Sequence, residues 1–117
     1  MKVRYIGFGE IKIEGVRYSE DVVIEGGKVR PRDKKPSKAF KARYGHTPLS
    51  AQEAIPWDCQ RLIIGTGAHG ALPVMDEVRA EAQRRGVELV AVPTPEACAL
   101  LKEADLRTTN AILHLTC

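Results

Sequence analysis

The sequence predicts a three-layer α/β fold, in which a parallel or mixed βαβαβ sheet carries an N-terminal antiparallel β-meander as an added layer. Two patterns in the 117 residues lead to this prediction. Residues 1–31 alternate apolar and polar residues between glycine turns, which is typical of antiparallel strands. Residues 61–117 alternate short apolar runs with segments of helical periodicity, which is typical of parallel strands joined by crossover helices. The length suits a single domain, residues 1–117, with one hydrophobic core.

The N-terminal meander is expected to contain two hairpins. The first has short alternating strands at 11–13 and 16–18, joined by Glu14-Gly15, where glycine supplies the positive φ of a two-residue turn. The second turn, at residues 25–28, contains two glycines and has apolar residues on both sides. We therefore expect residues 1–31 to form one small meander.

Residues 32–60 are expected to be a basic connector with a short helix. From Lys28 to Arg43 the chain carries eight lysines and arginines and one acid, a net charge of +7 in a chain whose total is +3. Such a stretch either docks an anionic partner or is a solvated connection between two structural halves. Its two prolines favour the solvated connection. Nucleic acid is not the expected partner, because few aromatic residues accompany the charge. Thr47-Pro48 predicts a helix through Ala54.

Strands and helices are expected to alternate in residues 61–117. The strands are expected at Arg61–Ile64, Val87–Val92 and Ala111–Leu115. Pro73 opens one helix, Gly86 follows its last turn, and Thr94 caps the other helix. Right-handed crossovers make the three strands parallel, and ligands of such sheets bind beyond the carboxyl ends of the strands.

A glycine-rich loop at that edge is the main candidate site. Its residues, 65–70, have the spacing Gly-x-Gly-x-x-Gly, and glycines let backbone N–H groups approach an anion closely. A dinucleotide is not expected, because the helix begins at Pro73, after the third glycine, and no acid ends the second strand. No cofactor is therefore expected. The loop is either a structural turn or part of a pocket for phosphate or carboxylate.

The candidate ligand-binding residues come from this loop, from the second helix and from the basic connector. They are Gly65, Thr66, Gly67, Ala68, His69, Gly70, Thr94, His46 and Arg43. The connector supplies its two members if it folds back over the strand ends, where Lys41 would add a further cation. His114 is expected instead to be a hydrogen-bonded core histidine, because its strand is expected to be buried on both faces.

The three cysteines, Cys59, Cys98 and Cys117, indicate neither a disulfide framework nor a metal site, because they are odd in number and widely spaced. Cys98 is expected in the core, whereas Cys117 is either a reactive thiol or simply a strand end. No secretory signal and no apolar run of membrane-spanning length is evident. Free thiols then favour a cytoplasmic protein without membrane contact.

Several short motifs, spread over nearly the whole chain, resemble those of a known protein family. They are Phe8-Gly9-Glu10-Ile11, Gly15-Val16-Arg17-Tyr18, Asp21-Val22-Val23-Ile24, Gly45-His46, Leu62-Ile63-Ile64-Gly65-Thr66-Gly67, Thr94-Pro95-Glu96-Ala97 and His114-Leu115-Thr116-Cys117. In these motifs the sequence resembles a small single-domain family of unknown function, which includes the adipogenesis-associated human protein and a mitochondrial complex I assembly factor. The resemblance implies a three-layer α/β fold with an added β layer, and it implies no known reaction.

Three hypotheses about function follow. The first is a module that binds a small anionic or nucleotide-like ligand at Gly65–Gly70, with Thr94 and His46. The second is a protein-interaction or assembly-factor module without catalytic activity. The third, ranked last, is an enzyme that uses His46 or His69 as an acid–base group.

Overall fold

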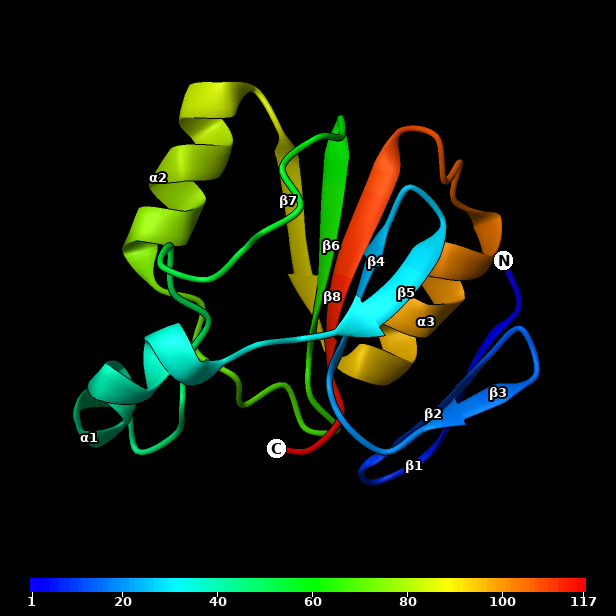
Figure 1. Ribbon diagram of the computed structural model, residues 1–117, viewed down its shortest axis with the longest axis horizontal. Coiled ribbons are helices and arrows are strands. Elements are labelled where there is room, and N and C mark those ends of the chain that lie inside the picture. Colours follow the sequence, from blue (N-terminus) through cyan, green and yellow to red (C-terminus); the bar gives the residue numbers. More distant parts are fainter.

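The computed structural model describes residues 1–117 as two sheets and four helical segments (Figure 1). The strands are β1 (Val3–Gly7), β2 (Glu10–Ile13), β3 (Val16–Tyr18), β4 (Val22–Glu25), β5 (Lys28–Pro31), β6 (Arg61–Thr66), β7 (Glu88–Val92) and β8 (Thr109–His114). The helices are the 3₁₀ helix η1 (Lys35–Phe40), α1 (Lys41–Tyr44), α2 (Asp76–Arg85) and α3 (Thr94–Glu103). The α/β class predicted from the sequence is confirmed.

The larger sheet is mixed and has the strand order β5-β4-β8-β6-β7. Strand β6 pairs in parallel with both β7 and β8, whereas β4 pairs antiparallel with β5 and β8. The predicted βαβαβ unit is thus β6-α2-β7-α3-β8. Its third strand, β8, lies between β4 and β6 in the middle of the sheet.

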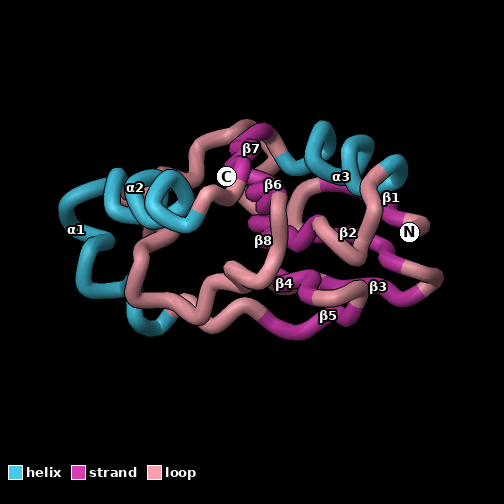
Figure 2. The backbone as a smooth tube through the Cα atoms, turned by 90° about the horizontal axis from the view of Figure 1, so that it is seen from above, coloured by secondary structure: helices cyan, strands magenta, loops and turns pink.

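The sheet separates two hydrophobic clusters, because successive strand residues point to opposite faces. On one face Leu62 and Ile64 pack with Val78 and Ala82 of α2. On the other face Ile63 packs with residues of α3 and with the inner face of the small sheet β1-β2-β3. Figure 2 shows the resulting layers, with α2 on one side of the five strands and α3 with the small sheet on the other.

Residues 1–31 are divided between the two sheets and do not form one meander. Strands β1, β2 and β3 form the separate three-stranded sheet, whereas the β4–β5 hairpin extends the larger one. The reason lies in Val22, Val23 and Ile24, which are all nearly completely buried. A strand that is apolar on both faces needs a covering layer on each side, and a position next to β8 provides both.

The prediction of a helix at Thr47–Ala54 is wrong. The helical turns of the connector come earlier, in η1 and α1, and residues 47–54 contain no helix but a single parallel bridge, from Leu49 to Val74, followed by a turn. Leu49 is fully buried there and exchanges backbone hydrogen bonds with Pro73 and Met75. Because these bonds hold residues 73–75 beside Leu49, α2 begins at Asp76 and not at Pro73 as expected. Tertiary pairing therefore overrides the local helix signal in both segments.

The ends of the other elements largely follow the sequence. Gly86 follows α2 in the left-handed conformation, with φ of +69°, as expected of a helix stop. Thr94 is the first residue of α3 and not its cap, because Pro93 occupies the capping position. None of the helices is long and apolar enough to span a membrane.

Candidate functional site

The glycine loop uses its backbone N–H groups within the protein. The Gly67 amide donates to Thr94 Oγ1 at 2.9 Å. The amides of Ala68 and Ala71 donate to the carbonyl oxygens of Thr116 and Cys117, at 3.2 and 3.3 Å. The loop is therefore hydrogen-bonded both to the start of α3 and to the segment after β8. Because their hydrogens are used in these bonds, the three amides are not free to bind an anion.

Close packing accounts for two of the loop glycines. A Cβ atom at Gly65 would lie 2.8 Å from Thr94 Oγ1 and 3.0 Å from a methyl group of Leu113. A Cβ atom at Gly67 would collide with the carbonyl oxygen of Thr116, and the φ of Gly67 is +106°, a value that side chains rarely permit. These glycines are required by backbone proximity whether or not a ligand is bound.

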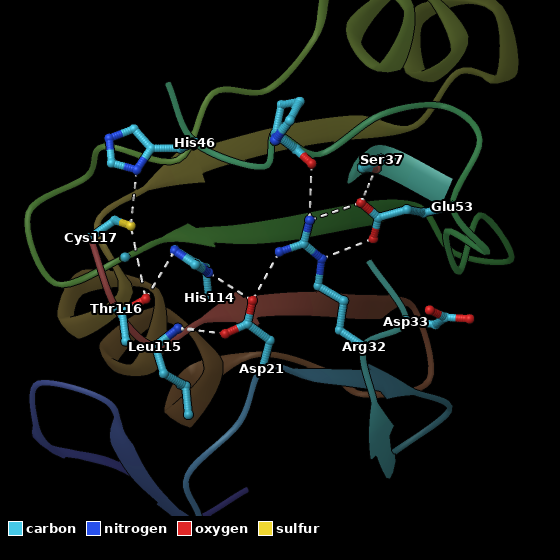
Figure 3. A network of polar contacts seen from close by, with 12 residues as sticks. Asp21, Arg32, Asp33, Ser37, His46, Glu53, His114, Leu115, Thr116 and Cys117 are labelled. Carbon is cyan, nitrogen blue, oxygen red and sulfur yellow. Dashed lines mark hydrogen bonds and ion pairs between the residues drawn. The ribbon is translucent and has the colours of Figure 1, made fainter. Parts of the chain in front are cut away.

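A buried ion-pair network lies beside this loop (Figure 3). Arg32 comes directly after β5, and its side chain is 1% exposed. It donates to both carboxylate oxygens of Glu53 at 2.8 Å, to Asp21 Oδ2 at 2.9 Å and to the Pro48 carbonyl at 3.1 Å. The Ser37 hydroxyl donates to the same Glu53 carboxylate. Burial opposes the charge of Arg32, but the two carboxylates outweigh it and raise the Arg32 pKa.

Asp21 links this network to His114. Its Oδ2 lies 2.7 Å from His114 Nδ1, and its Oδ1 accepts the Leu115 amide at 2.9 Å. Burial alone would raise the pKa of Asp21, but the bonds from His114 and Leu115, together with the charge of Arg32, lower it. An ionised carboxylate only accepts, so Nδ1 of His114 carries a proton and Nε2 points away, 3.4 Å from Thr116 Oγ1. The prediction of a buried, hydrogen-bonded His114 is confirmed.

A pocket of about 290 Å³ opens at the end of β8, and we call it the β8-end pocket. Its lining consists of Lys34, Lys41, Gly45, His46, Thr47, His114, Thr116 and Cys117. None of these residues is acidic, and two are lysines from the basic connector. The Cys117 thiol lies 3.5 Å from His46 Nδ1 and 3.8 Å from Thr116 Oγ1 (Figure 3).

The structure brings together only part of the residue set predicted from the sequence. His46 lines the β8-end pocket, whereas Thr94 and Gly67 lie buried behind its wall. Arg43 is outside it, with its guanidinium 5.3 Å from the ring centre of Tyr44. His69 is exposed and lies beside Phe8, with ring centres 6.4 Å apart. The connector does fold back over the strand ends, and the expected Lys41 lines the pocket, but Lys34 reaches it in place of Arg43.

The sequence reasoning did not identify Asp21, Arg32, Glu53 or Lys34 as members of the site. Arg32 stands among seven other cations, and a charge run of that kind usually indicates solvent. Asp21 and His114 did stand within two of the motifs that carry the family resemblance. The signal that could have identified them was their position, as polar residues at the ends of apolar segments.

No group of three or more histidine, cysteine or acidic side chains is arranged to hold a metal ion.

Comparison with protein families gives a match to "Protein of unknown function (DUF498/DUF598)" over residues 3–111. The chain belongs to this family. A conserved hypothetical protein from Pyrococcus horikoshii OT3, PH1505, is similar over the full length of both chains, with 30% identity and a TM-score of 0.80.

Two further solved structures are similar to this DUF498/DUF598 chain. The one described as MT938 is 28% identical with a TM-score of 0.68, over 94% of this chain and 93% of that one. An outer membrane protein from Bartonella henselae shares the fold alone, at 16% identity and a TM-score of 0.64, over 98% of this chain and 94% of that one. No curated protein matches the chain.

Proposed function

We propose that this DUF498/DUF598 protein binds a small anionic ligand, such as a phosphate or carboxylate compound or a nucleotide-like molecule, in the β8-end pocket. The observation that carries the proposal is the lining itself, which contains Lys34, Lys41 and His46 and no acidic residue. The nearest carboxylate of the network, Asp21, is already neutralised by Arg32 and bound to His114. Positive charge in the pocket is therefore not compensated by the side chains that line it.

The geometry gives each part of the site a role in this proposal. The lysines and His46 supply donors to the anion, and each charge-assisted hydrogen bond contributes about 1.5–3 kcal/mol. The Thr47 and Thr116 hydroxyl groups can donate to further ligand oxygens. The glycine loop acts indirectly, because its amides hold the backbone of Thr116 and Cys117 in place. The volume of about 290 Å³ is just below the roughly 300–1,000 Å³ typical of ligand pockets, so the pocket suits a small ligand.

Calorimetry with inorganic phosphate, small carboxylates and nucleotides tests this proposal. We expect Lys34→Gln and Lys41→Gln each to weaken the binding of the best ligand about tenfold or more. Lys38→Gln is the matched control, because Lys38 is an exposed lysine of the same segment and does not line the pocket. An equal loss in all three variants would indicate general electrostatic attraction and would contradict a specific site.

A second candidate function is protein interaction, which is favoured by Phe8 in the β1–β2 turn. Its side chain is 66% exposed, and Val16 at the β2–β3 turn is 53% exposed; these two are the exposed large apolar residues of the chain. The resemblance to the adipogenesis-associated and assembly-factor proteins agrees with this function. Loss of a captured partner on Phe8→Ser, with the Lys34→Gln protein still binding it, would support this candidate over the anion pocket.

We also propose that the protein works in the cytoplasm. Its three cysteines are unpaired, and unpaired thiols are typical of a reducing compartment. Localisation of the tagged full-length chain by microscopy tests this.

A further inference from the structure

The three cysteines lie in different chemical environments. Cys98 is 2% exposed on the buried face of α3, and burial raises its pKa to about 11. Burial also raises the pKa of Cys59, which donates to the Pro56 carbonyl. Cys117 is partly exposed and opens into a pocket that contains two lysines. Because the thiolate is the nucleophile, Cys98 and Cys59 are poorly suited to reaction, and Cys117 is the thiol that opens into a pocket.

Cys117 belongs to a cluster of groups that come from distant parts of the chain. His46 Nδ1, from the connector after α1, lies 3.5 Å from the thiol sulfur and can accept its proton. Thr116 Oγ1 lies 3.8 Å from the sulfur and 3.4 Å from the Nε2 atom of the buried His114. Figure 3 shows His46 and Cys117 facing each other across the pocket, with His114 held from behind by Asp21. The thiol therefore has a group within reach that can accept its proton, and it opens into the same pocket as Lys34 and Lys41.

We propose that Cys117 is a thiol–disulfide exchange site for low-molecular-weight disulfides that carry carboxylate or phosphate groups. His46 accepts the thiol proton, and Lys34 and Lys41 hold the anionic group of the disulfide. This inference rests on the proposed function, because it assigns the anion in the β8-end pocket to one class of reactive substrate.

The exchange balances without a further reactant. The thiol proton moves from Cys117 Sγ to His46 Nδ1, and the thiolate attacks one sulfur of the bound disulfide. A new S–S bond forms to Cys117 as the old S–S bond breaks, and the electron pair leaves on the second sulfur. That sulfur takes the proton from His46, so Cys117 is oxidised to a mixed disulfide while the departing half is reduced to a thiol.

No second cysteine lies in the pocket to resolve the mixed disulfide. The modification therefore persists until an external thiol reverses the same steps. The site would record the ratio of disulfide to thiol in the small-molecule pool as a reversible adduct on Cys117.

The test uses the full-length Cys59→Ser protein and two probes. One is DTNB, a dicarboxylate disulfide, and the other is the uncharged bis-hydroxyethyl disulfide; rates are measured near pH 7 and adducts are located by mass spectrometry. Cys117→Ser should remove the fast adduct with both probes. His46→Gln should slow both reactions about tenfold, because the thiol then loses the group that accepts its proton.

The lysine variants separate the exchange site from the anion pocket. Lys34→Gln and Lys41→Gln should slow the DTNB reaction severalfold and leave the neutral probe unchanged, and Lys38→Gln should change neither. If the lysine variants change neither rate, the anionic substrate class and the proposed pocket are both overturned. If His46→Gln leaves both rates unchanged while phosphate or carboxylate binding is detected, the exchange site is overturned and the proposed function stands.

Discussion

The glycine loop and the β8-end pocket lie next to each other and differ in where their polar groups point. In the loop, the amides of Gly67, Ala68 and Ala71 all donate to acceptors of the protein itself. In the pocket, Lys34 and Lys41 form no ion pair within the protein, and both line the open space. A glycine-rich pattern thus marks a place where the backbone must approach another group closely. That group can be a ligand, but here it is another segment of the same chain.

Replacing Gly67 by alanine is expected to have the largest effect on stability and tests the structural role of the loop. The new Cβ would collide with the Thr116 backbone, which is not a flexible neighbour. We expect a loss of more than about 4 kcal/mol, or no folded protein. Gly86→Ala is the matched control, because Gly86 also has a positive φ but no atom within 4 Å of its Cβ position, so it should cost only about 1–2 kcal/mol.

Urea denaturation of both glycine variants measures this difference. A Gly67→Ala protein as stable as Gly86→Ala would mean that the loop can move away from the segment after β8. In that case its amides would be available to a ligand after all.

Replacing Arg32 by methionine tests the network behind the pocket. The change leaves Glu53 buried without its partner, and breaking a buried pair in this way costs about 3–5 kcal/mol. The control is Arg30→Met, two residues earlier, where the pair with Glu25 is at the surface and contributes at most about 1 kcal/mol. Thermal unfolding of the two proteins should differ clearly; equal midpoints would mean that Glu53 finds another partner or becomes protonated at little cost.

Lowering the pH should weaken the same network through Asp21. The pKa of Asp21 is lower in the folded protein than its ordinary value of 3.8, so the unfolded chain binds the proton more readily. Its contribution to stability is therefore fully present above about pH 4 and is lost as the pH falls through the folded pKa. Asp21→Asn should be less stable near pH 7 and should lose less stability on acidification; parallel stability curves for the two proteins below pH 4 would contradict this.

Labelling of the cysteines is the smallest perturbation, because it needs no substitution. With an alkylating reagent, Cys98 should react most slowly in the native protein, since it is 2% exposed in the core. Cys117 should react first. The rate of adduct formation at each position, followed by mass spectrometry, checks the order, and early modification of Cys98 would show that the α3 face opens readily.

The parts of the fold that were predictable from the sequence rest on local patterns. The apolar runs around Ile63 and Val90 and the stop at Gly86 specify the alternating unit, because each depends on a few neighbouring residues. The apolar run at Val22–Ile24 was visible as well, but its choice of sheet depends on pairing with β8, nearly 90 residues later. The local pattern identifies such a strand but does not determine which other strand it pairs with.

The candidate site was less predictable, for a related reason. Its central contact joins Asp21 to His114, which are 93 positions apart in the chain. The location at the carboxyl end of β8 followed from the expected parallel strands, and His46 was among the residues expected there. Lys41 was also expected there, whereas the replacement of Arg43 by Lys34 depends on the path of the chain through η1 and α1, which the charge pattern does not specify.

The central position of β8 also affects how the chain reaches this fold during synthesis. The β4–β5 hairpin and the β6–β7 pair are made earlier, yet neither touches the other in the finished sheet; each needs residues 109–114 as its neighbour. Until those residues leave the ribosome, both partial sheets present an unsatisfied apolar edge. The two partial sheets can therefore join only after β8 has left the ribosome, and unpaired strand edges of this kind are prone to aggregation until then.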